Sequence, residues 1–308
     1  MEVVNKILLL GLNGQVGWEL NRSLACLGDL ISLDRNSAEF AQISLLRSLI
    51  LDVKPDIIVN AVAYTAVDKA EQEEELAFEV NAGSLKVIAE AAREMDAWLV
   101  HYSTDYVYDG EKAGPYIETD EVNPLSVYGR SKLAGEEEIR KSGCKHLIFR
   151  TSWVFSSRRH NFLKTILDLA SKRKQLNIVA DQFGAPTSAE LIADITAKCV
   201  QRLSIEKSYT QNSDVSKNLC GTYHLAAKGE VSWFSFAQRI VKRAKEKGAS
   251  FCLKTDNILP VSTSQYPLAA TRPCHSRLST AKLENVFSIN LPYWSDDVDS
   301  LIDELVKK

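Results

Sequence analysis

Long apolar runs, paired cysteines and an excess of charge of one sign are all missing from this sequence of 308 residues. Its longest apolar segments, such as Ile7 to Leu10 and Ile57 to Ala63, fall far short of the ~20 residues that a membrane-spanning helix needs. The six cysteines form no CxxC pair, which argues against a zinc cluster or a disulfide framework. With 37 basic and 40 acidic residues the net charge is -3, so no overall field favours nucleic acid or an anionic membrane.

The first residues do not have the pattern of a secretory leader. Met1 to Asn5 contains Glu2 and leads straight into a strand-like run, without a basic start, a long apolar stretch or a cleavage site. We therefore expect a cytoplasmic protein that has reduced cysteines and binds neither nucleic acid nor membranes. The composition, 45% hydrophobic and 25% charged, is typical of a globular chain.

Short apolar runs alternate with helical patterns through the first half of the chain. The predicted strands are 6–10, 30–33, 57–60, 98–103 and 146–150, and the predicted helices are 15–27, 44–52, 71–95 (broken near Asn81) and 128–142. The strands are apolar at consecutive positions, as in a parallel sheet that is covered on both faces. The sequence therefore predicts an α/β fold with a doubly wound parallel sheet of the Rossmann type.

Three glycines directly follow the first predicted strand. Gly11, Gly14 and Gly17 have the spacing GxxGxxG and open the first predicted helix. Glycine allows a tight turn and close backbone approach, so that amides at the helix start can hold a pyrophosphate. The alternative is a strand-to-helix turn without a ligand, but the position in the first βα unit favours a dinucleotide site. A Walker A loop is excluded because no Gly-Lys-Ser/Thr follows.

The nature of the dinucleotide is left open by two neighbouring residues. Asp34 ends the second strand, where a carboxylate can accept hydrogen bonds from the adenosine ribose and so favour NADH. Arg35 follows, and a guanidinium there can bind a 2′-phosphate and favour NADPH, or it can be a solvated surface charge. The cofactor is therefore expected to be NADPH or NADH.

Tyr128 and Lys132 stand four residues apart in a predicted helix and so project from one face. A free tyrosine has a pKa of about 10, and a neighbouring ammonium stabilises the phenolate. Such pairs also occur by chance on surface helices. Thr104, at the end of the fourth strand, can donate a hydrogen bond to a substrate carbonyl. Its presence favours a catalytic role for the Tyr128–Lys132 pair over a chance spacing. The three residues fit a ketone reduction in which Tyr128 donates the proton and Lys132 tunes Tyr128 and contacts the cofactor ribose.

In the second half of the chain, predicted strands and helices alternate less regularly. We expect residues 1–150 to form the NAD(P)-binding domain and residues 151–308 mainly a smaller α/β substrate-binding lobe. Segments at about 176–180 and 221–226 are expected to return to the main sheet. A helix is predicted over 162–173 and a loop over 181–188.

Seven motifs together resemble the extended short-chain dehydrogenase/reductases and, within them, the dTDP-4-dehydrorhamnose reductase family. They cover the chain almost from end to end: GLNGQVGWEL from Gly11, NAVAYTAVDKAE from Asn60, HYSTDYVYDG from His101, PLSVYGRSKLAGE from Pro124, FRTSWVF from Phe149, DQFGAPTSA from Asp181 and RPCHSRL from Arg272. The resemblance implies reduction of the C4 ketone of dTDP-4-dehydro-beta-L-rhamnose to dTDP-beta-L-rhamnose, for cell-surface polysaccharide.

The resemblance also assigns roles to single residues. It implies cofactor contacts by Gly11, Gly14, Gln15, Val16, Gly17, Asp34, Glu39, Phe40, Ala63, Tyr64, Thr65, Tyr102, Tyr128 and Lys132. Gln15 and Val16 would hold the pyrophosphate, and Glu39 and Phe40 the adenine. Thr104, Tyr128 and Lys132 would be catalytic.

On the substrate side the resemblance implies contacts by Thr104, Asp105, Trp153 and Arg272. The alternative for Trp153 is a core tryptophan. Arg272 suits a diphosphate because its guanidinium is permanently charged, and its alternative is a salt bridge that ties down the last segment.

Further expectations follow from the family. Some members bind magnesium between subunits through acidic residues, so Glu190, with Asp296, is a candidate Mg2+ ligand in a homodimer. Tyr106 stands where related 4,6-dehydratases carry a glutamate, which favours reduction over elimination. Reduction of another dTDP-deoxysugar remains an alternative, as does a non-catalytic regulatory subunit with a nucleotide-binding fold. Arg158, Arg159 and His160 make the segment after Trp153 more basic than the family pattern.

Overall fold

A six-stranded parallel sheet forms the centre of the computed structural model, which describes residues 5–34, 43–209 and 219–307. The strand order is β10 (Gly221–His224), β5 (Lys145–Thr151), β4 (Trp98–Thr104), β3 (Ile57–Asn60), β1 (Lys6–Leu10) and β2 (Asp29–Leu33), and all neighbours are parallel. The doubly wound fold is confirmed. The segment near 221 joins this sheet beside β5, as expected.

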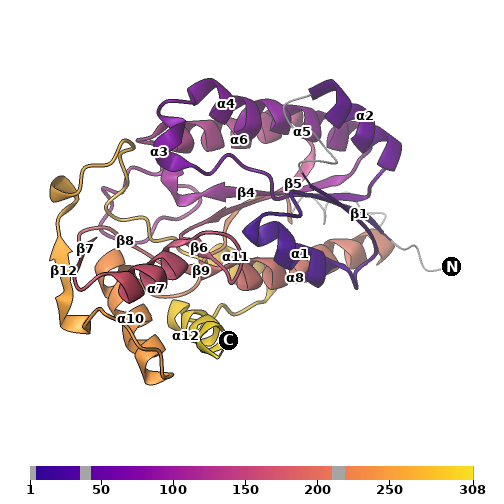
Figure 1. Ribbon diagram of the computed structural model, residues 1–308. Coiled ribbons are helices and arrows are strands. Elements are labelled where there is room, and N and C mark those ends of the chain that lie inside the picture. Colours follow the sequence, from indigo (N-terminus) through magenta and orange to yellow (C-terminus); the bar gives the residue numbers. More distant parts are fainter. Residues whose placement is uncertain (1–4, 35–42, 210–218, 308) are drawn as a thin grey trace.

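Helices cover both faces of the sheet (Figure 1). On one face lie α1 (Gln15–Leu24) and α8 (Ala189–Tyr209), and on the other α2 (Ile43–Val53), α5 (Ser84–Glu94) and α6 (Val127–Ser142). The side chains of β1 alternate accordingly: Ile7 and Leu9 belong to the α1 and α8 core, whereas Leu8 and Leu10 belong to the α2 and α5 core. Every position of β1 after Lys6 is buried, which is why Ile7 to Leu10 are all apolar.

The helix predicted over 71–95 is interrupted, as expected near Asn81. The structure has α3 (Val67–Ala70), α4 (Glu74–Phe78), a π-helical turn (Glu79–Gly83) and then α5. Asn81 is buried, its Oδ1 accepts from the Tyr64 amide at 2.9 Å, and its Nδ2 donates to Ser131 Oγ at 2.9 Å. The wider turn therefore directs an amide inward that joins the segment after β3 to α6.

The second half builds a smaller lobe around α7 (Phe162–Lys172), α10 (Trp233–Glu246) and α12 (Trp294–Val306), which share an apolar core. The 3-10 turns Thr255–Asn257 and Thr263–Gln265 flank β12 (Ile258–Val261) of this lobe. The short helix α11 (Ala281–Phe287) packs instead beside β10, where Leu283 joins the core of the main sheet. A further 3-10 turn, Asp105–Val107, follows β4. Two pairs of two-residue strands are β6 (Val154–Phe155) with β9 (Thr187–Ser188) and β8 (Phe183–Gly184) with β11 (Val231–Ser232).

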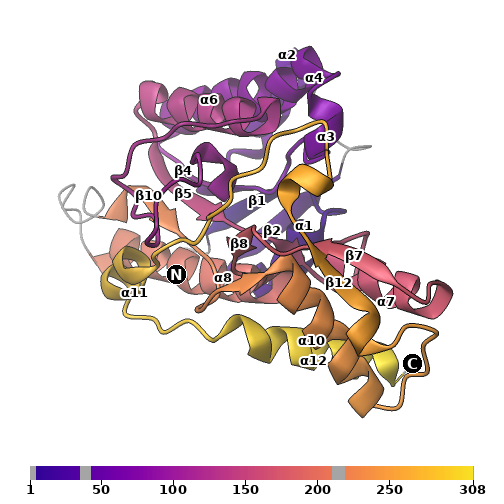
Figure 2. The ribbon, with the colours of Figure 1, turned by 90° about the vertical axis from the view of Figure 1, so that its left-hand side faces the viewer.

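The expectation that 176–180 returns to the main sheet is wrong. β7 (Leu176–Val179) is a strand, but it pairs in parallel with β12 (Ile258–Val261) in a separate sheet (Figure 2). The position beside β5 is taken by β10, and Leu176 and Ile258 are buried in the core of the second lobe. The loop predicted over 181–188 also contains the short strands β8 and β9. Within the described residues, no helix has both the length and the apolar character to cross a membrane.

Candidate active site

A cavity of about 900 Å³ lies at the carboxyl ends of β1, β3, β4 and β5. This is the edge at which doubly wound sheets bind ligands. The predicted site residues that line it are Gly11, Gly14, Gln15, Val16, Ala63, Thr65, Tyr102, Thr104, Asp105, Tyr128, Lys132 and Trp153. The residues predicted from the sequence and from the family resemblance are thus brought together in one cavity.

The glycine loop forms a close backbone cradle at one end of this cavity. Gly11 has φ +93°, and a Cβ there would lie 2.9 Å from the main chain of Ala61. A Cβ on Gly17 would lie 2.0 Å from the Gly11 carbonyl oxygen. The N-terminus of α1 has no side-chain cap among the described residues, so its first amides are available to an anion. These residues fit a dinucleotide pyrophosphate.

The adenosine end of the predicted site is only partly described. Asp34 lies after β2, where its Oδ2 accepts a hydrogen bond from Asn13 Nδ2 at 2.8 Å. Glu39, Phe40 and Arg35 lie outside the described residues. Tyr64 is not among the residues that line the cavity: its hydroxyl donates to Glu73 Oε2 at 2.6 Å, and this hydrogen bond raises its pKa to about 12.

Thr104, Asp105 and Tyr128 meet at the centre of the cavity. Thr104 and Asp105 are buried, and Thr104 Oγ1 donates to Asp105 Oδ1 at 3.1 Å. Tyr128 lines the same cavity as these two residues. Burial raises the pKa of Asp105 to about 7, and its Oδ2 has no hydrogen-bond partner within the described part of the chain. The cavity lining therefore places two hydroxyl groups and a buried carboxyl group together.

The hydrogen-bond partners of Lys132 in the structure lie on β4. Burial raises the pKa of Tyr128 to about 12, opposite to the direction expected from a neighbouring ammonium. The Lys132 ammonium instead donates to the Tyr102 main-chain oxygen at 2.6 Å and lies 3.1 Å from Nε2 of His101. Burial lowers the pKa of Lys132 to about 7, while the carboxylate of Glu136 opposes this shift. The Tyr102 hydroxyl is directed to Thr196 Oγ1, 2.9 Å away.

Of the predicted substrate contacts Trp153 and Arg272, only Trp153 lines the cavity. Trp153 lines the cavity with φ +47° and stacks on Trp233, their ring centres 3.4 Å apart. Arg272 lies outside the cavity lining and donates to both carboxylate oxygens of Asp68, at 2.7 and 3.1 Å. The structure therefore shows the salt bridge of Arg272, and its contact with a diphosphate stays a prediction.

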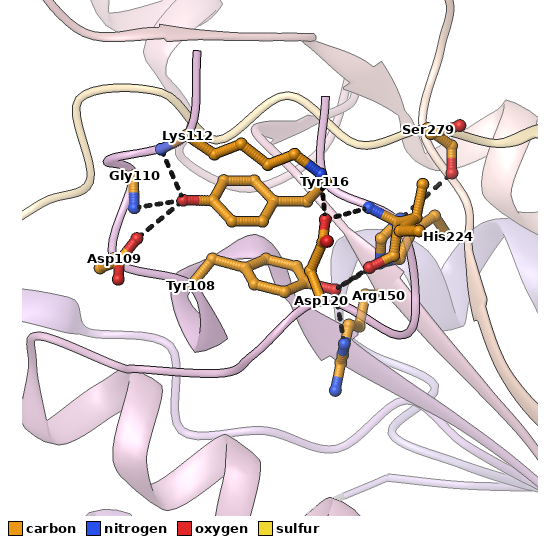
Figure 3. Close-up of polar contacts among 10 residues, drawn as sticks. Tyr108, Asp109, Gly110, Lys112, Tyr116, Asp120, Arg150, His224 and Ser279 are labelled. Atoms are coloured by element: carbon orange, nitrogen blue, oxygen red, sulfur yellow. Dashed lines mark hydrogen bonds and ion pairs between the residues drawn. The ribbon is translucent and has the colours of Figure 1, made fainter. Parts of the chain in front are cut away.

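Behind the cavity, a buried polar network joins β5 and β10 to the loop after β4 (Figure 3). Tyr108 is fully buried, accepts from Arg150 Nη1 at 2.6 Å and lies 2.8 Å from His224 Nε2. Burial lowers the pKa of His224 to about 3, so its ring is neutral. Tyr116 stacks on Tyr108 and donates to Asp109. This network fixes the loop that begins at Thr104.

Sequence reasoning missed Glu136 and His101. Both oxygens of the fully buried Glu136 accept from Arg150, at 2.9 and 2.7 Å. Its spacing of four from Lys132 on one helix is a signal that could have revealed it. His101 lies within the fourth predicted strand, but only the fold brings it to Lys132.

The residues around Glu190 do not form a magnesium site within one chain. Glu190 lies in the first turn of α8, and burial, followed by the charge of Glu19, raises its pKa. No group of three His, Cys, Asp or Glu side chains in the described ranges could hold a metal ion, whereas Mg2+ requires several oxygen ligands. Asp296 lies on α12, where Ser295 donates to it. The expected metal site is not supported, and no step is assigned to a metal.

Comparison with known proteins identifies relatives along nearly the whole chain. A family model described as RmlD substrate binding domain matches residues 5–307. The dTDP-4-dehydrorhamnose reductase of Escherichia coli (strain K12) is 45% identical over 303 residues, covering 97% of this chain and 97% of that protein. That of Burkholderia thailandensis is 44% identical over 303 residues, covering 98% and 100%.

A solved structure agrees over the same extent. The crystal structure of dTDP-4-dehydrorhamnose reductase from Bacillus anthracis str. Ames in complex with NADP has a TM-score of 0.87 and 31% identity, and it covers 98% of this chain and 100% of that chain. The resemblance predicted from the seven motifs is thereby confirmed: the chain belongs to the RmlD substrate binding domain family, together with these dTDP-4-dehydrorhamnose reductases.

Proposed function

We propose that this protein uses NADPH or NADH to reduce the C4 ketone of dTDP-4-dehydro-beta-L-rhamnose, which yields dTDP-beta-L-rhamnose. One observation carries the proposal: Tyr128, Thr104 and Lys132 line the same cavity as the glycine loop. The full-length relatives named as dTDP-4-dehydrorhamnose reductases support the substrate. The relative solved with NADP supports a nicotinamide cofactor.

Proton delivery falls to Tyr128. Its pKa of about 12 keeps the hydroxyl protonated at neutral pH, so it can donate to the carbonyl oxygen as the alcohol forms. Thr104 lines the cavity with Tyr128, and its hydroxyl can turn from Asp105 to donate to the same carbonyl oxygen. The reduced nicotinamide, when bound, supplies the hydride for the carbonyl carbon. The resulting tyrosinate regains its proton from solvent.

Lys132 and Asp105 hold the reactants. The Lys132 ammonium is fixed by the Tyr102 carbonyl and has a donor left for a ribose hydroxyl of the cofactor. The open Oδ2 of Asp105 can accept from a sugar hydroxyl, which would remove the cost of its unpaired burial. The stacked rings of Trp153 and Trp233 offer an apolar wall on the substrate side.

Three further proposals rest mainly on the resemblance. Residues 151–308 mainly form the substrate-binding lobe, which Trp153, Trp233 and Phe236 in the cavity lining support. The protein forms a homodimer, and it acts in the cytoplasm. Light scattering during size-exclusion chromatography tests the dimer, and cell fractionation tests the location.

The test of the function is to follow oxidation of NADPH and of NADH by purified protein with enzymatically made dTDP-4-dehydro-beta-L-rhamnose. We expect rapid oxidation and dTDP-beta-L-rhamnose as the product by NMR, equally with magnesium or with a chelator. Turnover of only another dTDP-4-keto sugar would contradict the substrate. No turnover of any such sugar, in protein that binds the dinucleotide, would instead support the regulatory subunit.

A further inference from the structure

The segment between β6 and α7 carries two adjacent exposed arginines, Arg158 and Arg159. It lies against the glycine loop from the distant half of the sequence. Gln15 Oε1 lies 3.0 Å from Ser156 Oγ and accepts from Asn161 Nδ2 at 3.0 Å. Ser156 and Asn161 are both buried, so the segment is fixed to the loop on each side of the arginines.

Each arginine makes its own contact with the loop or with the helix that follows it. Arg159 Nε donates to the main-chain oxygen of Asn13 at 2.8 Å, and its backbone has φ +57°, which is unfavourable for a residue with a Cβ. The Arg158 guanidinium lies over the ring of Trp18 on α1, 3.3 Å from the ring centre. Both positive charges are thus held at the entrance to the glycine loop.

The arginines also share a hollow. A second cavity, of about 300 Å³, is lined by Asn13, Trp18, Arg158 and Arg159, and Asn13 and Arg159 line the large cavity as well. The two cavities therefore meet at the glycine loop. No carboxylate in the part of the chain that the structure describes forms an ion pair with either guanidinium. Two permanent positive charges without an acidic partner suit a phosphate group.

We propose that Arg158 and Arg159 bind a phosphate group of the dinucleotide. This inference rests on the proposed function, because it takes NADPH or NADH as the ligand. Asn13, which accepts from Arg159, also donates to Asp34, the carboxylate expected at the adenosine ribose. The site therefore faces the adenosine half of the dinucleotide, which carries two kinds of phosphate. The 2′-phosphate is present only in NADPH, and the pyrophosphate is common to both cofactors.

Isothermal titration calorimetry of NADPH and of NADH, without substrate, tests the proposal. We expect Arg158→Gln and Arg159→Gln each to raise the Kd about three- to thirtyfold, because a charge-assisted contact to phosphate is lost. The effect should shrink at high salt. Arg173→Gln is the matched control, since Arg173 is exposed at the far end of α7 and lines neither cavity.

The outcomes separate the ligand phosphate from the alternatives. A rise in Kd for NADPH alone assigns the arginines to the 2′-phosphate, and an equal rise for NADPH and NADH assigns them to the pyrophosphate. Arg159→Gly must weaken binding as Arg159→Gln does, because glycine adopts φ +57° without strain and only the charge is lost. Unchanged Kd values in the double variant, or normal binding by Arg159→Gly, overturn the inference. A wild-type protein that binds neither dinucleotide overturns the proposed function itself.

Discussion

Nζ of Lys132 lies 3.1 Å from Nε2 of His101, and both side chains are buried. Burial, with the charge of Lys132, holds the pKa of His101 well below its ordinary value, so the ring is neutral. An ammonium has only donors, which assigns Nε2 of His101 as the acceptor of this contact. His101 thus offsets part of the cost of burying the Lys132 charge.

The pH dependence of activity should report this contact. The pKa of Lys132 is lowered to about 7, so kcat/KM for the sugar at saturating NADPH should fall as pH rises through that value and the ammonium is lost. His101→Phe removes an acceptor and should move this fall to lower pH, whereas His101→Gln, which keeps one, should move it less. Identical profiles for wild type and His101→Phe would contradict the role.

Tyr128→Phe removes the proposed proton donor and leaves the ring in place. We expect kcat to drop by about 10²- to 10⁴-fold with unchanged dinucleotide affinity, because only the proton transfer is lost. Steady-state rates and calorimetric binding measure the two quantities. Tyr266→Phe, at an exposed position away from the cavity, serves as the control. Retained turnover in Tyr128→Phe would remove Tyr128 from its assigned role.

Asp105 should make folding stability depend on pH. Burial raises its pKa from 3.8 to about 7, so the folded state holds the proton more tightly than the unfolded state does. The stability that the neutral carboxyl contributes is complete below about pH 4 and is lost as pH rises through about 7. Urea unfolding across this range should show the loss in wild type, and its absence in Asp105→Asn. If the unfolding free energies of the two proteins changed with pH in the same way, the role of Asp105 would be refuted.

Gly17→Ala should disrupt the glycine loop. The added Cβ would lie 2.0 Å from the Gly11 carbonyl oxygen, and backbone atoms cannot yield as a flexible side chain can. We expect the free energy of unfolding to fall by about 1–3 kcal/mol, together with weaker dinucleotide binding. Gly114→Ala is the control, because nothing lies within 4 Å of its Cβ position. Equal behaviour of the two variants in thermal and calorimetric assays would count against the cradle.

Glu136→Gln should be strongly destabilising. Glu136 and Arg150 are an ion pair with side chains 0% and 3% exposed, and the substitution leaves the guanidinium buried without its counter-charge. Breaking such a pair typically costs about 3–5 kcal/mol of unfolding free energy. The adjacent Glu137 is 50% exposed beside Lys141, so Glu137→Gln should cost at most about 1 kcal/mol. Chemical denaturation distinguishes the two, and a small effect at Glu136 would disprove the argument.

Much of this fold and of the candidate site could be predicted from short-range sequence patterns. The glycine loop and the Tyr128–Lys132 spacing each lie within one short segment, and consecutive apolar residues revealed the strands of the parallel sheet. The break near Asn81 was also visible, although not its reason, because the partners of Asn81 lie on other elements.

Contacts between distant segments were beyond local patterns. The pairing of β7 with β12 depends on which strand takes the place beside β5, and this is decided by the whole topology. Arg272 has the charge for a diphosphate, but its neighbour in space is Asp68. The burial of Tyr128 was not visible in the sequence for the same reason, since burial is a property of the folded chain.

The place of β10 in the sheet makes the two halves of the chain interdependent. A fragment that stopped at residue 150 would leave the outer edge of β5 with unpaired amides and carbonyls, and such an edge promotes aggregation. The complementary fragment would hold β10 without a neighbour to pair with. Cleavage of the chain between β5 and β10 would therefore separate two strands that pair with each other, and we expect the complete sheet to form only when both pieces are present.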